Sequence, residues 1–264
     1  MFLLPEKLMS KKTQPPPEKQ RPREHPLELL SSYSRLFIGY FFVFTFVIGW
    51  FEIPSSSMEN TLLIGDHVLV NREQFAPPTK GLRTIMPYGE VHHGDVVVFL
   101  SPAQPELYLV KRIIGIPGDR IHLHQGAVYR DGVKLTESYV IHTGDAYAYR
   151  DEFPAVPAPD FDDSITDAWR IEMPQHVENG DIVVPPNCYF AMGDNRDVSR
   201  DSRYFGFVPR ENLIGRPMMI YWSFESSESD YLQTGLSNRF RSFANTIIHF
   251  LDRTRWRRSF RVIR

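Results

Sequence analysis

A serine-rich loop and a lysine within an apolar segment are the parts of this chain that could do chemistry together. Ser55-Ser56-Ser57 follows directly after an uncharged apolar run, and Lys111 interrupts the apolar segment 107–114. A serine hydroxyl is a poor nucleophile until a base removes its proton. A lysine can be that base only when its amine is desolvated and its pKa falls toward neutrality. Together the two can make a nucleophile and its base.

Strand alternation surrounds Lys111 with apolar side chains. Its face of the expected strand also carries Leu107, Leu109 and Ile113, and the opposite face carries Arg112 among apolar residues. Two ordinary interpretations stay open. The lysine stem can pack at a sheet edge while its ammonium reaches water, and a run of serines can be a surface loop without chemistry.

The uncharged run after Arg35 predicts a membrane-spanning helix over residues 35–53. At 1.5 Å per residue the run covers roughly 24 Å, slightly less than a hydrocarbon core of about 30 Å, and Trp50 suits the interface. A cleaved signal peptide is the rival interpretation, because Ser55 and Ser57 mimic a small-x-small cleavage site. We favour an anchor, since a long segment precedes the run and the run exceeds a signal-peptide core.

Residues 1–34 read as a disordered cytoplasmic tail, because Pro15-Pro16-Pro17 and mixed charges cannot bury enough apolar surface to order the segment. Lysines and arginines before the run place this end in the cytoplasm by the positive-inside bias. We therefore expect residues 54–230 to form an extracytoplasmic domain.

Short extended segments separated by Gly-Asp turns predict that this domain is mainly antiparallel β. The expected strands are 67–70, 95–100, 108–116, 120–123, 127–129, 181–184 and 189–192. The proline-rich, acidic segment 151–167 reads as a loop or insertion, and its role is open. Residues 231–264 are expected to be a basic amphipathic helical tail, which either lies on anionic lipid or packs on the β-domain.

The sequence contains little that indicates a metal, phosphate or nucleic-acid binding site. A single cysteine, Cys188, leaves no cysteine-based zinc cluster, and the nine histidines have no metal-ligand spacing. Asp197, Ser199 and Asp201 alternate like calcium ligands, but the turn glycine and bidentate glutamate of an EF-hand are missing. No glycine-rich phosphate loop or nucleic-acid motif is present, so we expect no metal, no cofactor and no nucleic-acid partner.

Several ordered segments of the chain resemble the bacterial type I signal peptidases, membrane-anchored serine proteases with a Ser-Lys dyad. The matching segments are Pro54–Leu62, Gly65–Val70, Gly94–Phe99, Val110–Asp119 and Gly193–Gly206. Two positions depart from the family pattern. Asn60 stands where many members have proline, and Val198 stands where many have asparagine.

The resemblance implies a signal-peptidase-like antiparallel β-sheet domain with a second β subdomain inserted at about 131–187. It makes Ser57 the nucleophile and Lys111 the general base. The remaining roles are supporting. Ser55 would be an oxyanion donor, and Ser199 would orient the lysine. Asp201, Arg203 and Arg112 would be structural neighbours of the site. The lining of shallow pockets for small side chains would be Ile53, Pro54, Met58, Leu62 and Val110.

The implied activity is cleavage of signal peptides from exported preproteins after small residues of the Ala-x-Ala type, at the bacterial inner membrane. The protein would be single-pass, would contact lipid, and would depend on the Sec and Tat export machinery only indirectly. Rival functions are an organellar peptidase, a self-cleaving repressor and a catalytically silent anchored β-domain. The repressor is disfavoured because no DNA-binding helical domain precedes the serine. Individual substrates and the oligomeric state are not predicted.

Overall fold

The computed structural model describes residues 26–42, 44, 47–75, 89–145, 147–155, 158, 162–232 and 245–263. The chain divides into two compact units, Met1–Phe41 and Phe42–Arg264. Helix α1 spans Pro26–Phe42, and its large apolar side chains are exposed. Residues 1–25 of the expected disordered tail lie outside the described residues, whereas residues 26–34 belong to α1, so the expectation of disorder is wrong there and the helix begins before Arg35. Within them, no helix is both long enough and apolar enough to cross a membrane.

The expected helix over 35–53 is wrong at its carboxyl end, because Ile48–Glu52 forms strand β1. This strand pairs antiparallel with β2, from Ile48 opposite Asn71 to Glu52 opposite His67. Its aromatic and β-branched residues suit a strand as well as a lipid-embedded helix. Pairing with β2 gives the backbone its hydrogen-bond partners, and so decides the structure of this segment.

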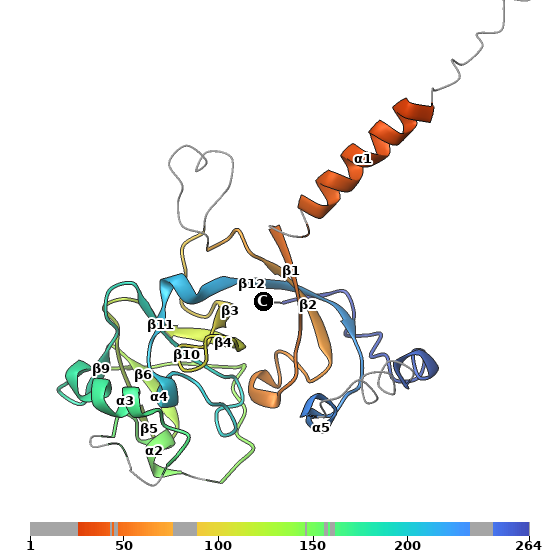
Figure 1. The fold of residues 1–264 in the computed structure, drawn as a ribbon. Coiled ribbons are helices and arrows are strands. Elements are labelled where there is room, and N and C mark those ends of the chain that lie inside the picture. Colours follow the sequence, from red (N-terminus) through yellow and green to blue (C-terminus); the bar gives the residue numbers. More distant parts are fainter. Residues whose placement is uncertain are drawn as a thin grey trace, which may run out of the picture. The chain divides into compact units, whose positions relative to one another are not determined.

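Two antiparallel sheets form the second unit, which confirms a mainly β fold (Figure 1). The larger has eight strands in the order β1-β2-β12-β3-β4-β10-β11, with β13 also paired to β12. The bounds of its remaining strands are β2 Asp66–Asn71, β3 Val96–Leu100, β4 Tyr108–Gly115, β10 Cys188–Met192, β11 Val208–Pro209, β12 Leu213–Ser223 and β13 Arg261–Val262.

The smaller sheet has five strands in the order β7-β6-β5-β9-β8 and lies between β4 and β10 along the chain. Its strands are β5 Arg120–His124, β6 Ala127–Arg130, β7 Val133–Lys134, β8 Val177–Glu178 and β9 Asp181–Val183. The insertion that we placed at 131–187 therefore divides this sheet, because the hairpin of β5 and β6 comes earlier and belongs to it.

Short helices connect and cover the strands. They are η2 Ser56–Met58, α2 Ala148–Asp151, α3 Asp167–Glu172, η3 Met173–His176, α4 Ser202–Phe205, η4 Arg210–Asn212 and α5 Glu228–Leu232. Thr166 caps α3, since its hydroxyl accepts from the amide of Trp169. In Figure 1, α2 and α3 lie around the strands of the smaller sheet.

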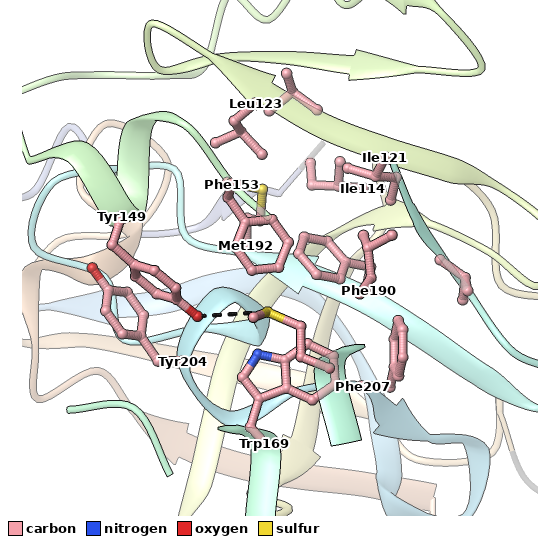
Figure 2. Packing of buried hydrophobic residues seen from close by; sticks show 14 of the residues in the cluster. Ile114, Ile121, Leu123, Tyr149, Phe153, Trp169, Phe190, Met192, Tyr204 and Phe207 are labelled. Carbon is pink, nitrogen blue, oxygen red and sulfur yellow. Dashed lines mark hydrogen bonds between the residues drawn. The ribbon is translucent and has the colours of Figure 1, made fainter. Parts of the chain in front are cut away.

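A core shared by the two sheets fixes the smaller one against the larger. Figure 2 shows Ile114 and Phe190 of the larger sheet packed with Ile121 of the smaller one. Trp169 from α3 lies in the same cluster and is 1 % exposed. Described parts of the acidic segment 151–167 contain no strand, as expected of a loop, yet they contribute the buried residues Phe153, Ala158 and Ile165 to this core.

The carboxyl-terminal segment packs on the larger sheet through one side. Arg258 forms an ion pair with Asp66 at 2.7 Å, and Arg255 donates to the carbonyl of Phe224 at 2.8 Å. Strand β13 then pairs with β12. Of the expected helix over 231–264, the structure has α5 and a helical turn at 245–248, while 233–244 lies outside the described residues.

Candidate active site

The serine loop is held tightly between β1 and β2. Ile53 donates its amide to the carbonyl of Asp66 at 2.9 Å and accepts from the amide of Gly65 at 2.9 Å. Between them, η2 turns the chain so that Ser57 is half-buried while Met58, 1 % exposed, packs into the core below. Burial of Met58 anchors the loop and so limits the movement of Ser57.

Lys111 comes from the middle of β4, where β3 pairs with it and Val97 lies opposite. The side chain is 3 % exposed. Its Nζ donates a hydrogen bond to Ser57 Oγ at 2.6 Å. The fold therefore brings the two residues that suggested chemistry in the sequence into direct contact.

Burial lowers the pKa of Lys111 to about 8, because desolvation disfavours the ammonium. The negative charge of Asp201 opposes this shift, the guanidinium of Arg203 adds to it, and Asp194 opposes it again. Near and above pH 8 a large share of the molecules thus carry a neutral amine. A neutral amine at hydrogen-bond distance can accept the proton of a serine hydroxyl.

Gly193 lets the segment after β10 lie directly against the serine loop. A Cβ at this position would meet Ser199 Oγ at 2.2 Å and the carbonyl oxygen of Ser57 at 2.5 Å. The next contact along the chain is a hydrogen bond from the amide of Asn195 to the Ser57 carbonyl, at 3.1 Å. Only glycine fits between these groups without a shift of the site.

The two supporting serines occupy different positions in the site. Ser55 Oγ lies 3.4 Å from Ser57 Oγ, close to the hydroxyl that would attack. Ser199 is 3 % exposed, and its hydroxyl has no hydrogen-bond partner among the described residues. The hydrogen bond that we expected between Ser199 and the Lys111 ammonium is therefore not formed here.

Asp201 and Arg203 form a buried bidentate ion pair, with Nε–Oδ1 and Nη2–Oδ2 distances of 2.8 Å each. Asp201 also accepts from the amide of Gly193 at 3.0 Å and caps α4 through the amide of Arg203. The pair holds the Gly193 turn in place. Arg203 also places a cation near Lys111.

Arg112 lies beside Lys111 in sequence and reaches a different set of partners. It binds the Asp194 carboxylate at 2.8 and 2.7 Å, donates to the Thr61 hydroxyl at 3.1 Å, and donates to the carbonyl of Gly94 at 2.8 Å. One side chain thus joins β4, the serine loop and the segment after β10. Sequence reasoning assigned no role to Asp194 or Thr61, and the Gly-Asp turn at 193–194 was the signal that could have found the aspartate.

The five residues expected to line substrate pockets divide into two groups. Ile53, Met58 and Leu62 are between 0 and 3 % exposed and belong to a core cluster beneath the loop. Pro54 is exposed and Val110 is half-buried. Contact of any of them with substrate stays a prediction, and Pro54 and Val110 are the accessible ones.

Within the described part of the chain, no three histidine, cysteine or acidic side chains lie close enough together to hold a metal ion. The arrangement offers instead a hydroxyl in contact with a buried amine. Such a pair is suited to nucleophilic attack with proton transfer to the amine.

The chain is similar to known proteins over most of its length. The family model described as signal peptidase, peptidase S26, matches residues 27–222. A signal peptidase I of Buchnera aphidicola subsp. Acyrthosiphon pisum is 30% identical over 258 residues, covering 81% of each chain. One of Pseudomonas aeruginosa is 31% identical over 215 residues, covering 74% of this chain and 73% of the relative. One of Aquifex aeolicus is 31% identical over 220 residues, covering 71% of this chain and 81% of the relative.

Among solved structures, a signal peptidase I from Enterococcus faecalis V583 is 30% identical in sequence. It matches 48% of this chain and 96% of its own length, with a TM-score of 0.33.

Proposed function

Because this chain belongs to the peptidase S26 family of signal peptidases, we propose that Ser57 is its nucleophile and Lys111 its general base. The chain is a serine endopeptidase with signal peptidase I activity, and it cleaves signal peptides. The assignment of the two roles is supported by one observation above the others. Lys111 is buried, its pKa is lowered to about 8, and its Nζ lies 2.6 Å from Ser57 Oγ.

The reaction then begins with the neutral amine of Lys111. As Ser57 Oγ attacks the carbonyl carbon of the scissile bond, its proton moves to Nζ. The resulting ammonium gives its proton to the leaving amine as the peptide C–N bond breaks, so the mature protein departs and the signal peptide stays bound to Ser57 as an ester. A water molecule, deprotonated by the same amine, then hydrolyses this ester and releases the signal peptide from the enzyme.

Ser55 and Ser199 support the dyad in this proposal. The hydroxyl of Ser55, 3.4 Å from Ser57 Oγ, is close enough to donate to the oxyanion that forms on the substrate carbonyl. The buried hydroxyl of Ser199 forms no hydrogen bond within the described part of the chain, and it lies against Gly193, as the Ser57 carbonyl does. We assign it the role of accepting a hydrogen bond from Lys111 once that amine has become charged.

Substrate choice is the finer part of the proposal. Secretory preproteins with small residues before the scissile bond, of the Ala-x-Ala type, fit a site in which Pro54 is exposed on the tightly packed serine loop and Val110 is half-buried in β4. A steric limit of this kind is enough to select small side chains.

We place the enzyme at the bacterial inner membrane as a single-pass protein, with its amino terminus in the cytoplasm and the β-domain outside. Support comes from α1, whose apolar side chains include Leu36 at 70 % and Ile38 at 70 % exposure. Exposed apolar residues of this kind suit lipid better than water. The export machinery would supply substrates, and hence be an indirect partner.

The carboxyl-terminal segment adds a second surface suited to lipid. Arg255 and Arg258 point into the domain, whereas Ile248, Leu251 and Phe260 are between 73 and 77 % exposed. Exposed arginines at 253 and 257 lie between Leu251 and Phe260 in sequence, and exposed Arg261 directly follows Phe260. Exposed apolar side chains with arginines between them favour contact with an anionic membrane surface. Packing on the domain and lying on lipid are thus compatible.

Matched substitutions test the dyad. Ser57→Ala and Lys111→Ala should each abolish cleavage of a preprotein by the purified, detergent-solubilised chain, because each removes half of a unit. Lys111→Arg should be inactive as well, since a guanidinium stays protonated. Ser56→Ala, in the same 3₁₀ helix, and Lys134→Ala, on an exposed strand, are the controls and should cleave normally. Clear turnover by any of the three dyad variants would refute the assignment.

A further inference from the structure

A segment outside the dyad contacts the three elements that build the active site, which are the serine loop, β4 and the segment after β10. We call residues 137–145, which follow β7, the strap. They connect the smaller sheet to α2. Sequence reasoning gave this segment no role, and the proposed mechanism does not use it.

The strap is bound along the segment after β10. Ile141 donates its amide to the carbonyl of Asp194 at 3.0 Å and accepts from the amide of Arg196 at 3.1 Å, as a parallel bridge opposite Asn195. Thr143 donates its hydroxyl to the Asn195 side chain at 2.9 Å. Asn195 is the residue whose amide holds the Ser57 carbonyl, so the strap adjoins the serine loop through one residue.

A buried ion pair fixes the first residue of the strap. Glu137 accepts from the guanidinium of Arg196 at 2.6 and 3.0 Å, and the two side chains are 8 and 2 % exposed. Arg196 in turn donates to the carbonyl of Gly193 at 3.1 Å. Glu137 also accepts from the Tyr139 hydroxyl at 2.8 Å. The tyrosine ring is therefore held in one orientation.

That ring lies on Arg112. The distance from the Arg112 guanidinium carbon to the centre of the Tyr139 ring is 3.9 Å, a close cation–π contact. The covered guanidinium is the one that binds Asp194, Thr61 and the Gly94 carbonyl. Arg112 also directly follows the base in β4, so its position bears on where Lys111 meets Ser57.

The strap reaches the serine loop itself through Asn60, whose side-chain amide donates to the carbonyl of Tyr139 at 3.0 Å. Asn60 has a φ of 85°, a left-handed conformation that proline cannot adopt. Asn60, one of the two positions at which this chain departs from the family pattern, thus contacts the strap.

We propose that Tyr139 is a positioning residue of signal-peptide cleavage: its ring holds Arg112, and its carbonyl holds Asn60, so that Lys111 and Ser57 keep their hydrogen-bonded geometry. The inference rests on the proposed roles of Ser57 and Lys111. Tyr139 does not enter the chemistry itself. It acts through Arg112 on one side of the dyad and through Asn60 on the other.

Loss of the Tyr139 ring should raise the pKa of Lys111 and so shift the pH dependence of cleavage to higher pH. The charged groups that act on Lys111 are Asp201, Arg203 and Asp194, all from the segment after β10, and Arg112 on its own strand neutralises Asp194. If Arg112 is released, the Asp194 charge is less compensated and favours the ammonium form of Lys111. The base then needs a higher pH to become neutral.

Steady-state kinetics of the full chain in detergent, with a preprotein substrate, test the proposal. Tyr139→Leu should lower kcat by on the order of tenfold with KM within about twofold, because positioning is lost and binding is not. Its acid limb in kcat/KM should move to higher pH. Tyr139→Phe keeps the ring and should retain the wild-type limb and most of the rate.

Tyr129→Leu is the matched control, because the Tyr129 ring is likewise stacked, on His122 at 4.8 Å, but in the smaller sheet. Its rate should be unchanged. A wild-type rate and limb in Tyr139→Leu, or a Phe variant as slow as the Leu variant, would overturn the proposal.

Asn60→Gly gives a second test that does not depend on the folding of the Leu variant, since Asn60 is exposed and glycine accepts its φ. We expect a several-fold fall in kcat with an unmoved acid limb, and an unchanged kcat would count against the strap. Parallel assays of wild type and Ser57→Ala separate the two ideas. If Ser57→Ala cleaves, the proposed dyad fails, whereas normal Tyr139 and Asn60 variants beside an inactive Ser57→Ala refute only the strap.

Discussion

At the scale of single residues, burial of Lys111 destabilises the fold but gives the amine the lowered pKa that the reaction needs. An amine in an apolar strand is costly while it is charged, and that cost is what lowers its pKa to about 8. Ser57 is its hydrogen-bond partner, so the desolvated lysine is useful only where the serine lies. The site therefore combines a destabilising burial with the proton transfer that the reaction requires.

Replacement of Lys111 by methionine should make the protein inactive and more stable. The folded-state pKa of about 8 lies below the value of 10.5 for a free lysine, so the unfolded chain binds the proton more tightly. The penalty is complete below about pH 8 and disappears as pH rises through about 10.5. We expect Lys111→Met to raise the free energy of unfolding at pH 7 by on the order of 1–3 kcal/mol, with a smaller gain at pH 10.

Chemical denaturation of the two proteins at both pH values checks this prediction, and Lys134→Met serves as the exposed control. A Lys111→Met protein that is no more stable than wild type at pH 7 would mean that the lysine is well solvated in the folded state.

The sequence predicts which residues belong to the candidate site better than it predicts their contacts. The serine loop and the lysine strand stand out in the sequence, and their motifs carry the resemblance that the comparisons confirm. The hydroxyl of Ser199 illustrates the limit, because its expected hydrogen bond with Lys111 is not formed. So does Tyr139, whose contacts with Arg112 and Asn60 join residues far apart in the chain, with no local pattern to reveal them.

At the scale of elements, the region inserted between β4 and β10 contacts the site through hydrogen bonds to the Arg203 carbonyl. Trp169 of α3 donates its indole N–H to the carbonyl of Arg203 at 3.1 Å, and Tyr149 of α2 donates its hydroxyl to the same carbonyl at 2.6 Å. Arg203 is the partner of Asp201, which holds the Gly193 turn. The smaller sheet and its helices thus reach the dyad through the buried ion pair.

Removal of the Trp169 side chain should therefore be costly for the fold. Trp169→Ala empties a site that is 1 % exposed and leaves the Arg203 carbonyl with one donor fewer. We expect a loss of about 3–5 kcal/mol in the free energy of unfolding. Ile171→Ala on the same helix, 72 % exposed, should change it by less than about 0.5 kcal/mol.

Urea denaturation followed by far-UV circular dichroism gives both values. Equal, small effects of the two substitutions would show that α3 contributes little to the packing between the sheets.

The strands of the domain were predictable because short runs rich in β-branched residues, bounded by turns that contain Gly-Asp, mark them, as at β3 after Gly94-Asp95 and β4 before Gly118-Asp119. Strand β1 was not, because the run before Glu52 is apolar in the way that both a lipid-embedded helix and a sheet strand are. Its pairing with β2 is a tertiary contact that decides between the two. The start of the smaller sheet at Arg120 was missed for the same reason, since only pairing of β5 with β9 shows that β5 belongs there.

At the scale of the whole molecule, β1 places the start of the catalytic domain earlier in the chain than residue 54, where the sequence suggested it. A fragment that begins at Ile53 lacks β1, and with it the partner of β2 and the packing of Phe51 on the core beneath Ser57. A fragment that begins at Phe44 retains both.

The longer fragment should cleave a short peptide substrate in detergent, and the fragment that begins at Ile53 should unfold at a lower temperature and cleave more slowly. The physical reason is an exposed row of hydrogen-bonding groups on β2 and a lost apolar contact near the serine loop. Thermal unfolding and peptide cleavage of the two fragments provide the comparison. Identical stability and rate would show that β1 is dispensable for the site.

The pH dependence of kcat/KM for preprotein cleavage by the full chain tests the central claim most directly, since it reports the ionisation of the base in the free enzyme. A buried Lys111 base predicts an acid limb with an apparent pKa of about 8, with activity falling as pH drops below it and the amine gains its proton. Ser56→Ala should have the same limb. A limb near the ordinary lysine pKa of 10.5, or one near the histidine pKa of about 6.5, would contradict a desolvated Lys111 as the base.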